Sequence, residues 1–530
     1  MATTLTSELA CQLAGNLFNK QSNLIGLWQT LADNFYPERA DFRYQNSLGD
    51  ELADATVDSY PILARRDLGN SFHAMLRDGP WFQLWGGKDS NLDRDGKMWL
   101  DFATKRQMQA LSTRESNFER SVKEGDMDFA TFGNAVLSIE PNRTWNGVVY
   151  RSWHLRNCAW EEDASGNVET VARKWNPTLH QLVETFGKEK LSPEMQTTYD
   201  KSPFETADIL HLVVPAQLTH NDKYIGKYKY VSMFIDKKSK KFIEETGINY
   251  KYYIVPRFQT ISGSAYAFSP ATIVALPDAR TLQAMTYTLL EAAERYARPP
   301  MVATQQVVTG VVDLRPNGIT WVDNEYDERL GQALRSLDQN KGGYPIGATE
   351  RGRIYEILNK AFYLESLNLP STGQEMTAYE VQERMKQYRR QNLPLFAPME
   401  KDYNGQLCET TFDLLMMMGQ FGSPQDIPRS LQGADVSFKY KSPLSQDEEE
   451  EKMNRFQQTS EMLRAAVELE PSAADNLDFD AAFRDAVQGI KAPLTWLRPQ
   501  EDIAQVREVR SAQQAAQAAA EAGLAGAPPG

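Results

Sequence analysis

Hydrophobic residues recur at helical spacing through most of the first 130 positions of the chain. One apolar stripe runs from Leu9 to Leu31, and Pro37 is expected to end that helix because proline lacks the backbone N–H that a helix needs. Further helical stretches are predicted at about residues 60–76 and 98–125. Between them, residues 81–85 are typical of a short strand.

Apolar runs typical of strands replace the helical pattern at about residues 135–255. The predicted strands cover residues 135–139, 150–160, 168–175, 209–214, 228–235 and 250–255. Residues 163–167, Asp-Ala-Ser-Gly-Asn, separate two of them and are typical of a hairpin turn. These patterns predict an α+β region.

Helical patterns return after this region. Pro277 is expected to open a helix that ends before Pro299 and Pro300. A small β segment is predicted at residues 301–322, followed by a helix at about residues 350–367.

The C-terminal part is also predicted to be largely helical. A short loop at residues 368–374 leads to a long helical stretch, residues 378–418, which Pro394 and Pro398 must kink or break. A further stripe follows the acidic run at residues 447–451, and acidic residues suit a helix N-terminus. The chain finishes with an Ala-rich segment, residues 511–530.

Composition narrows the possible classes of protein. The 530 residues are 41% hydrophobic and 24% charged, which predicts a folded chain of roughly two to four domains. A net charge of −14 excludes a protein that coats nucleic acid non-specifically. Three scattered cysteines exclude a disulfide framework and a cysteine-rich zinc site. Neither a signal peptide nor a membrane-spanning run of about 18 apolar residues is predicted, so a soluble, intracellular protein is expected.

No motif in the sequence predicts catalysis. Residues 342–349 have the glycine spacing of a phosphate loop, but Ala348 replaces the required lysine, and a connecting turn is expected instead. Residues 91–96 imitate the start of a calcium loop but end on Phe102 rather than glutamate, so an Asp-rich surface turn is expected. His180 and Glu184 lie four residues apart, as in a surface contact more often than in a metal site. We therefore predict no enzyme, no cofactor and no metal.

Four segments carry a resemblance to one family. Residues 31–39 form a helix that ends in an aromatic-Pro-x-Arg turn, and residues 129–137 contain Phe-Gly-Asn-Ala. Residues 256–300 include the Ser-Pro and Leu-Pro-Asp steps, and residues 376–384 read Met-Thr-Ala-Tyr-Glu-Val before Arg384. Together they resemble the head-to-tail connecting, or portal, proteins of short-tailed bacteriophages over most of residues 1–420. One departure is Ala267, where the family usually has glycine after the tyrosine.

The resemblance implies an α+β, mainly helical portal fold assembled as a ring of twelve subunits at one capsid vertex. The implied parts are a wing (1–274), a first stem helix (275–298), a clip (299–345), a second stem helix (346–367), a channel loop (368–376), a kinked long helix that returns to the wing (377–440) and a helical crown (441–530).

The resemblance also implies a role in the virion and a set of partners. The ring would conduct double-stranded DNA without sequence specificity during packaging and ejection, and would contact the major capsid and scaffolding proteins but no membrane. The large terminase subunit would dock on the clip and later be replaced by tail adaptor proteins. The candidate clip residues are Val307, Val308, Arg315, Asn317 and Trp321.

The expected channel wall holds DNA loosely, because strong neutralisation of phosphates would stall a moving duplex. The expected channel loop has no Lys or Arg and consists of Asn368, Leu369, Pro370, Ser371, Thr372, Gly373 and Gln374. A plain turn between helices has the same composition. The candidate basic residues around the channel are Lys360, Lys386, Arg389 and Arg390. Ion pairs between subunits or solvated faces are the alternative.

The stem is expected to be held by apolar packing between its two helices. The candidate packing residues are Leu282, Met285, Leu289, Tyr296, Ile354, Ile357 and Phe362. This packing is either within one subunit or partly across subunits. Pro394 and Pro398 mark either a hinge or a static kink in the long helix.

Two other functions stay open at this stage. One is a packaging enzyme of a phage, a nuclease or an ATPase, which the lack of a complete phosphate loop and of an acidic metal cluster disfavours. The other is a tail adaptor protein, which would also be structural.

Overall fold

The described part of the chain divides into two compact units. A computed structural model describes residues 4–44, 47, 49–53, 56–77, 79–86, 93–297, 301–303, 334–336, 343–367, 399–433, 436–440, 447–469, 477–489, 503, 506–507 and 509–514. Unit 1 comprises Met1–His73, Arg114–Pro141 and Val149–Thr410, and unit 2 comprises Ala74–Thr113, Asn142–Val148 and Thr411–Gly530.

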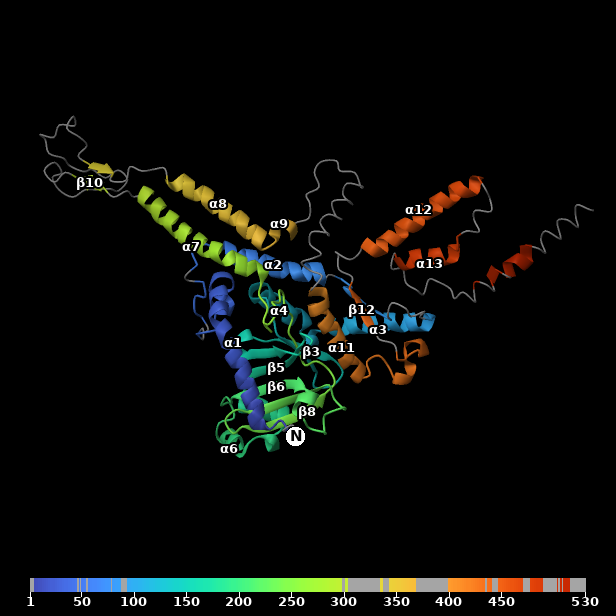
Figure 1. The fold of residues 1–530 in the computed structure, drawn as a ribbon, viewed down its shortest axis with the longest axis horizontal. Helices are drawn as coiled ribbons and strands as arrows, with labels where there is room; N and C mark the ends of the chain where they lie inside the picture. Colours follow the sequence, from blue (N-terminus) through green and yellow to red (C-terminus); the bar gives the residue numbers. More distant parts are fainter. Residues whose placement is uncertain are drawn as a thin grey trace, which may run out of the picture. The chain divides into compact units, whose positions relative to one another are not determined.

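Both units mix helices and strands (Figure 1). The α-helices are α1 (Ser7–Phe35), α2 (Tyr60–Leu76), α3 (Arg94–Ser112), α4 (Phe118–Phe132), α5 (Leu179–Phe186), α6 (Pro193–Lys201), α7 (Pro270–Ala297), α8 (Gly343–Ala361), α9 (Leu364–Leu367), α11 (Gln406–Met417), α12 (Asp447–Leu469) and α13 (Phe479–Gly489). The strands are β1 (Phe82–Trp85), β2 (Leu137–Pro141), β3 (Val148–Ser152), β4 (Cys158–Glu162), β5 (Val168–Trp175), β6 (Ile209–Pro215), β7 (Tyr230–Asp236), β8 (Lys241–Ile248), β9 (Tyr253–Ile254), β10 (Met301–Ala303), β11 (Leu334–Ser336) and β12 (Ser437–Tyr440). A π-helical turn, Glu400–Gly405, precedes α11.

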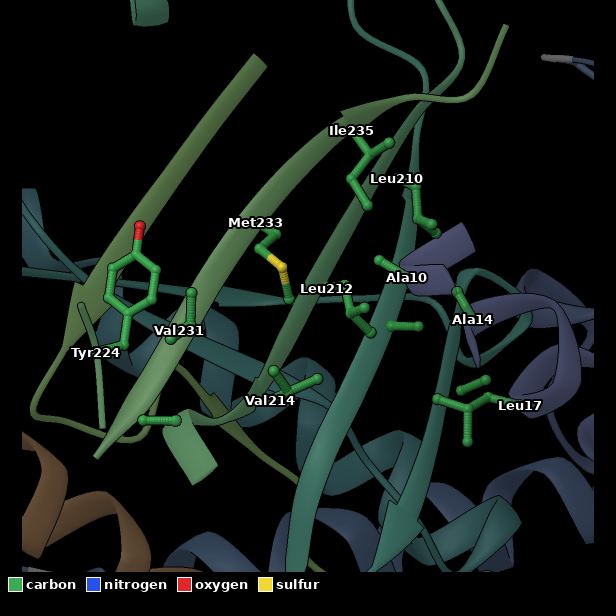
Figure 2. Close-up of a cluster of buried hydrophobic side chains, with 13 residues drawn as sticks. Ala10, Ala14, Leu17, Leu210, Leu212, Val214, Tyr224, Val231, Met233 and Ile235 are labelled. Atoms are coloured by element: carbon green, nitrogen blue, oxygen red, sulfur yellow. The ribbon is translucent and has the colours of Figure 1, made fainter. Parts of the chain in front are cut away.

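A five-stranded antiparallel meander, ordered β4-β5-β6-β7-β8, forms the centre of unit 1. Helix α1 crosses one face of this sheet, and its small residues Ala10 and Ala14 are almost fully buried there. Figure 2 shows them with Leu17 beside Leu210 and Leu212 of β6. Alanines spaced four apart lie on one helix face and let the helix approach the strands closely.

The opposite face of the same sheet buries polar residues. The guanidinium of Arg173 lies 3.7 Å from the ring of Trp153, and its Nε donates to the Tyr253 hydroxyl at 2.7 Å. His211 is fully buried between Tyr253 and Ser232, with ring nitrogens 2.5 and 2.8 Å from their hydroxyls. Burial and neighbouring Arg173 lower the pKa of His211 well below its usual value, so the imidazole is neutral.

Unit 2 contains a two-stranded ribbon and several helices. Strand β1 pairs antiparallel with β12, and the rings of Phe82 and Phe438 lie 6.0 Å apart across the pair. Phe412 of α11 contacts Phe438 at 6.1 Å. Further along the chain, α12 and α13 pack together through Phe456 and Phe479.

The structure confirms many of the predicted elements. The helix at Tyr60–Leu76 and the strand at Val168–Trp175 have the predicted bounds, and α1 ends at Phe35, two residues before Pro37. The turn at residues 163–167 joins the antiparallel strands β4 and β5, and α12 begins at the acidic run, at Asp447.

Three predicted helix bounds are wrong. The stretch at residues 98–125 is two helices, because Asn117 adopts a left-handed conformation (φ 52°) just before α4. Pro277 does not open α7 but lies inside it, and the helix begins at Pro270. Helix α8 begins at Gly343 rather than near Glu350, so residues 343–349 form helical turns instead of the expected connecting turn.

Other local predictions also need correction. The predicted strand at residues 150–160 is two strands separated by the 3₁₀ turn Leu155–Asn157. The sequence prediction missed β8, α5 and α6. Asp93, in the calcium-like segment, caps α3 by accepting a hydrogen bond from the Gly96 backbone at 2.8 Å. Its carboxylate therefore has a structural role at a helix end.

The contact between α1 and the sheet leads to a test with Leu17. We expect Leu17→Ala to lower the free energy of unfolding by about 2–4 kcal/mol, because it leaves a cavity in a buried cluster. Leu9→Ala on the same helix is the matched control, since Leu9 is 37% exposed, and should cost less than about 1 kcal/mol. Urea denaturation followed by circular dichroism measures both. Equal losses would contradict the described packing.

Candidate functional site

Helices α7 and α8 of unit 1 run side by side (Figure 1). Leu282 of α7 and Leu358 and Phe362 at the end of α8 are completely buried. Near the other end of the contact, the Leu289 side chain lies against Gly347, where a Cβ would be only 2.6 Å from Leu289 Cδ2. The absence of a side chain at Gly347 therefore allows close packing of the two helices.

The turn after α4 is locked to the segment that precedes α7. The amide of Asn134 donates from Nδ2 to the Ala267 carbonyl at 2.7 Å, and its Oδ1 accepts from the Ala267 backbone N–H at 2.9 Å. Gly133 has a left-handed φ of 74°, and a Cβ on it would lie 2.1 Å from the carbonyl carbon of Phe268. Both the conformation and the close backbone contact require glycine at this position.

Two hydroxyl groups tie the start of α7 to the end of α4. Ser269 Oγ donates to the Ala130 carbonyl at 2.6 Å, and Thr272 Oγ1 donates to the Thr131 carbonyl at 2.7 Å. These carbonyls lie in the last turn of α4, where backbone acceptors lack helical partners. The hydroxyl groups at the start of α7 therefore satisfy backbone carbonyls at the end of α4. We call Gly133, Asn134, Ser269 and Thr272 with these partners the α4–α7 root.

A second connection joins α7 to α8 through Asp58. Its Oδ2 accepts from Thr286 Oγ1 of α7 at 3.2 Å and from the Tyr355 hydroxyl of α8 at 2.7 Å. The Gln283 side chain accepts from the backbone N–H groups of Val57 and Asp58, each at 2.9 Å. Burial and the hydrogen bond to Asp58 raise the pKa of Tyr355 to about 12, so its hydroxyl keeps its proton near neutral pH.

Aromatic contacts extend this connection along α8. The rings of Tyr60 and Tyr355 lie 4.4 Å apart, and the Tyr60 hydroxyl donates to the side chain of Asn359. Phe35, at the end of α1, meets Phe362 edge to face at 5.5 Å. The end of α8 is thus held by both α1 and the start of α2.

A buried ion pair connects the turn after α1 to α4. Arg39 donates to both carboxylate oxygens of Asp128, at 3.0 and 2.8 Å, and Asp128 is almost completely buried. Burial opposes the charge on Arg39, but the Asp128 carboxylate outweighs it and raises the arginine pKa. The guanidinium of Arg65 lies 3.9 Å from the ring of Tyr36, and burial together with Asp128 raises the pKa of Tyr36 to about 12. Removing one partner of such a pair leaves an uncompensated buried charge.

Three of the four segments that carry the family resemblance converge here. Arg39 of the first segment pairs with Asp128, one residue before the second segment. Asn134 of the second segment binds Ala267 of the third. The fourth, residues 376–384, lies outside the described residues.

The predicted stem residues lie on both helices of this pair. Leu282, Ile354 and Phe362 are buried, and Met285, Leu289 and Ile357 are half-buried; Tyr296 belongs to α7, but its side chain is outside the described part. The contact of Leu289 with Gly347 shows packing of α7 on α8 within one chain.

Most of the other predicted site residues fall outside the described part of the chain. Lys360 is described and lies exposed in the last turn of α8. The residues outside are the loop Asn368–Gln374, the basic residues Lys386, Arg389 and Arg390, the clip residues Val307, Val308, Arg315, Asn317 and Trp321, and Pro394 and Pro398.

The sequence prediction missed Asp58, Gln283, Thr286 and Tyr355. An aspartate three residues before Pro61 could have been recognised as a residue at a helix start. No local pattern indicates its partners, which lie more than 220 residues away in the sequence. Gly133 and Asn134 belong to the Phe-Gly-Asn-Ala motif of the second segment, and the sequence alone does not indicate their structural role.

The described residues offer no arrangement that suggests metal-dependent chemistry. Among them, no three His, Cys, Asp or Glu side chains gather closely enough to hold a metal ion. His180 and Glu184 lie on α5 without a third ligand in that part of the structure. No helix in the described ranges is both long and apolar enough to cross a bilayer.

The α4–α7 root leads to a test of Gly133. We expect Gly133→Ala to lower the free energy of unfolding by about 3–5 kcal/mol, because the methyl group collides with the Phe268 backbone and the left-handed φ is strained. Gly166→Ala is the matched control, with a similar φ of 82° and no atom within 4 Å of the added carbon, and should cost about 1 kcal/mol. Denaturant midpoints compare the two. Similar losses would show that the close contact at Gly133 is unimportant.

Comparison with known proteins identifies the family to which this arrangement belongs. The model of a family described as bacteriophage head to tail connecting protein matches residues 8–497. The portal protein of Salmonella phage epsilon15 is 24% identical over 529 residues, covering 96% of this chain and 91% of that protein. The probable portal protein of Bordetella phage BPP-1 is 24% identical over 492 residues, covering 91% of this chain and 86% of that protein.

Among solved structures, a chain from the virion of a native gene transfer agent particle is similar at 8% identity and a TM-score of 0.34, covering 75% of this chain and 85% of its own length. The family match spans nearly the whole chain, and both portal relatives align with it along most of their length. The family predicted from the sequence is confirmed, and the chain belongs to the head-to-tail connecting, or portal, proteins of bacteriophages.

Proposed function

We propose that twelve copies of this chain form a closed ring at one vertex of a phage capsid and that double-stranded DNA passes through its centre during packaging and ejection. In this proposal α7 and α8 form the stem, and residues 299–345 form a clip that binds the large terminase subunit and later the tail adaptor proteins. The ring contacts the major capsid and scaffolding proteins. Family membership supports a structural role in the virion rather than catalysis.

The main observation behind this proposal is that α7 leaves large apolar side chains exposed. One face of the helix is buried within the chain through Ala275, Ala279 and Leu282. Outside that face, Tyr287 and Leu290 are each 57% exposed, although both are large apolar residues. A ring of identical subunits needs a heterologous interface on each copy, and exposed apolar residues of this kind suit such an interface.

Charge supports loose passage of DNA. The chain carries a net charge of −14, so the assembled ring is strongly acidic and does not bind the duplex tightly as a whole. Lys360 is an exposed cation near the end of α8, the end from which the chain continues toward the proposed channel loop. A sparse ring of such cations would centre the duplex without halting it. An interaction of Lys360 with the carbonyls at the helix end is the alternative role.

Ring assembly is tested by placing charges on the exposed side of α7. We expect the double variant Tyr287→Asp/Leu290→Asp to fold normally but to remain largely at the 60.0 kDa of one chain, because burying two carboxylates between subunits is costly. The unmodified chain should form particles of about 720 kDa, twelve times the single chain. Mass photometry and electron microscopy of the isolated particles measure the outcome.

The matched control for ring assembly is Leu218→Asp/Ile225→Asp. These two residues are 43% and 39% exposed apolar positions elsewhere in unit 1 and lie beside the sheet. This variant should still form rings. If the α7 variant assembles as well as the control does, the exposed side of α7 is not a subunit interface.

The role of Lys360 is tested by charge reversal. We expect Lys360→Glu to leave ring assembly intact and to lower the rate of DNA packaging by several-fold, because it replaces a centring cation with a repelling anion. Arg353→Glu on the same helix is the control, since Arg353 lies 3.8 Å from Glu350 and is expected to act in a local surface pair. The rate of DNA packaging is measured with purified proheads. If both variants packaged DNA at the rate of the unmodified chain, the proposal for Lys360 would be contradicted.

A further inference from the structure

A cavity of about 550 Å³ opens beside the sheet of unit 1. Its walls come from α5, α6, the segment just before β6 and the end of β7 with the turn that follows it. Leu179, Met195 and Ala207 supply apolar surface, and Thr198 and Thr206 supply hydroxyl groups. A volume of this size accommodates several side chains of a bound segment.

Most acidic side chains on the cavity wall are already engaged. Asp236 is 3% exposed and accepts hydrogen bonds from Ser239 Oγ at 2.5 Å and from the Lys238 backbone N–H at 3.0 Å. Asp208 accepts from the Asn176 amide at 3.0 Å. These carboxylates therefore organise the protein itself.

The remaining acidic wall residues leave little free negative charge. Glu194 pairs with Lys238 at 3.3 Å. Glu205 is the one remaining acidic residue on the wall, and it is exposed. Among the described residues, Glu205 is therefore the one carboxylate on this wall that makes neither an ion pair nor a side-chain hydrogen bond.

The turn between β7 and β8 brings positive charge to the edge of the cavity. It carries four lysines in five positions, and the buried Asp236 fixes it by accepting backbone and hydroxyl hydrogen bonds. Lys237, Lys240 and Lys241 are exposed and make no ion pair among the described residues.

An exposed aromatic side chain lies next to the same cavity in the chain. Phe204, in the connection between α6 and β6, is 76% exposed, and its neighbour Glu205 lines the cavity. The backbone here is held in place, since Leu179 and His180 donate to the carbonyls of Glu205 and Pro203, each at 2.8 Å. Exposed aromatic residues on a fixed backbone are frequent anchors of protein interfaces.

We propose that this cavity and the adjoining lysine turn bind an acidic segment of a partner protein, with an apolar side chain of that segment in the cavity and its carboxylates against Lys237, Lys240 and Lys241. Charge complementarity favours an anionic partner, because Lys237, Lys240 and Lys241 make no ion pair among the described residues, whereas three of the four acidic residues on the cavity wall are engaged. A protein segment fits better than duplex DNA, because a single side chain can enter this cavity and contact Leu179, Met195 and Ala207, whereas a rigid duplex cannot. This inference depends only on unit 1 and does not depend on ring formation.

Binding of a model peptide to the full-length chain tests the proposal. The probe is a fluorescent peptide in which glutamates flank a single phenylalanine, and fluorescence anisotropy measures its affinity at physiological salt. We expect Lys237→Gln/Lys241→Gln to weaken binding by about tenfold through lost charge pairing. Thr198→Phe, which fills the cavity from α6, should weaken binding at least as much while leaving every lysine in place.

The matched control is Lys223→Gln/Lys227→Gln, which removes the same charge from exposed lysines elsewhere in unit 1 and should change the affinity less than about twofold. Equal weakening by both lysine pairs would overturn the proposal, because binding would then depend on net charge alone. An unaltered affinity in Thr198→Phe would also overturn it. The chain could instead bind a DNA duplex more tightly than the peptide, with an affinity that Thr198→Phe does not change. That result would overturn the proposal and show that the lysine turn binds nucleic acid.

Discussion

The contact between Gly133 and the Phe268 backbone is the constraint on which the placement of α7 depends. Two backbones can approach this closely only where no side chain intervenes, and the left-handed conformation of Gly133 turns the chain directly after α4. The side-chain amide of Asn134 then makes two hydrogen bonds with the Ala267 backbone, one through its nitrogen and one through its oxygen. These contacts with α4 fix the first turn of α7, and the contacts of α7 with α8 lie further along the helix.

The remaining connections of α7 and α8 build on this fixed start. Asp58 joins the middle of α7 to α8, and Leu289 packs on Gly347 farther out. The ion pair of Arg39 with Asp128 holds the turn after α1 against α4. Helix α4 is thus the common support for segments that are separated by more than a hundred residues in the sequence. The proposed stem would project from this support, with its remaining apolar side chains available to neighbouring subunits.

Local patterns in the sequence were sufficient for some elements and insufficient for others. The helix at Tyr60–Leu76 and the strand at Val168–Trp175 are predictable because their apolar periodicity agrees with their final burial. The start of α7 at Pro270 is not, because hydrogen bonds from Ser269 and Thr272 to α4 extend the helix past the expected boundary at Pro277. Strand β8 is also hard to predict, since it is rich in charged residues and is stabilised mainly by pairing with β7.

The candidate site shows the same difference between residues that a local pattern reveals and residues that only tertiary contacts reveal. The apolar stripe of α7 and α8 can be found from spacing alone, whereas the polar partners of Asp58 depend on tertiary structure. The family motif around Gly133 is visible in the sequence, but its purpose becomes clear only when residues 267–272 lie beside it.

The α4–α7 root has a mechanical consequence. Its side-chain hydrogen bonds all lie near the start of α7: Ser269 and Thr272 donate to carbonyls at the end of α4, and the Asn134 side chain holds the Ala267 backbone. A force applied along α7 is therefore shared among these bonds at once instead of breaking them one after another. Such parallel loading suits the proposed stem, which would have to keep its position while a long polymer is pushed past it under pressure.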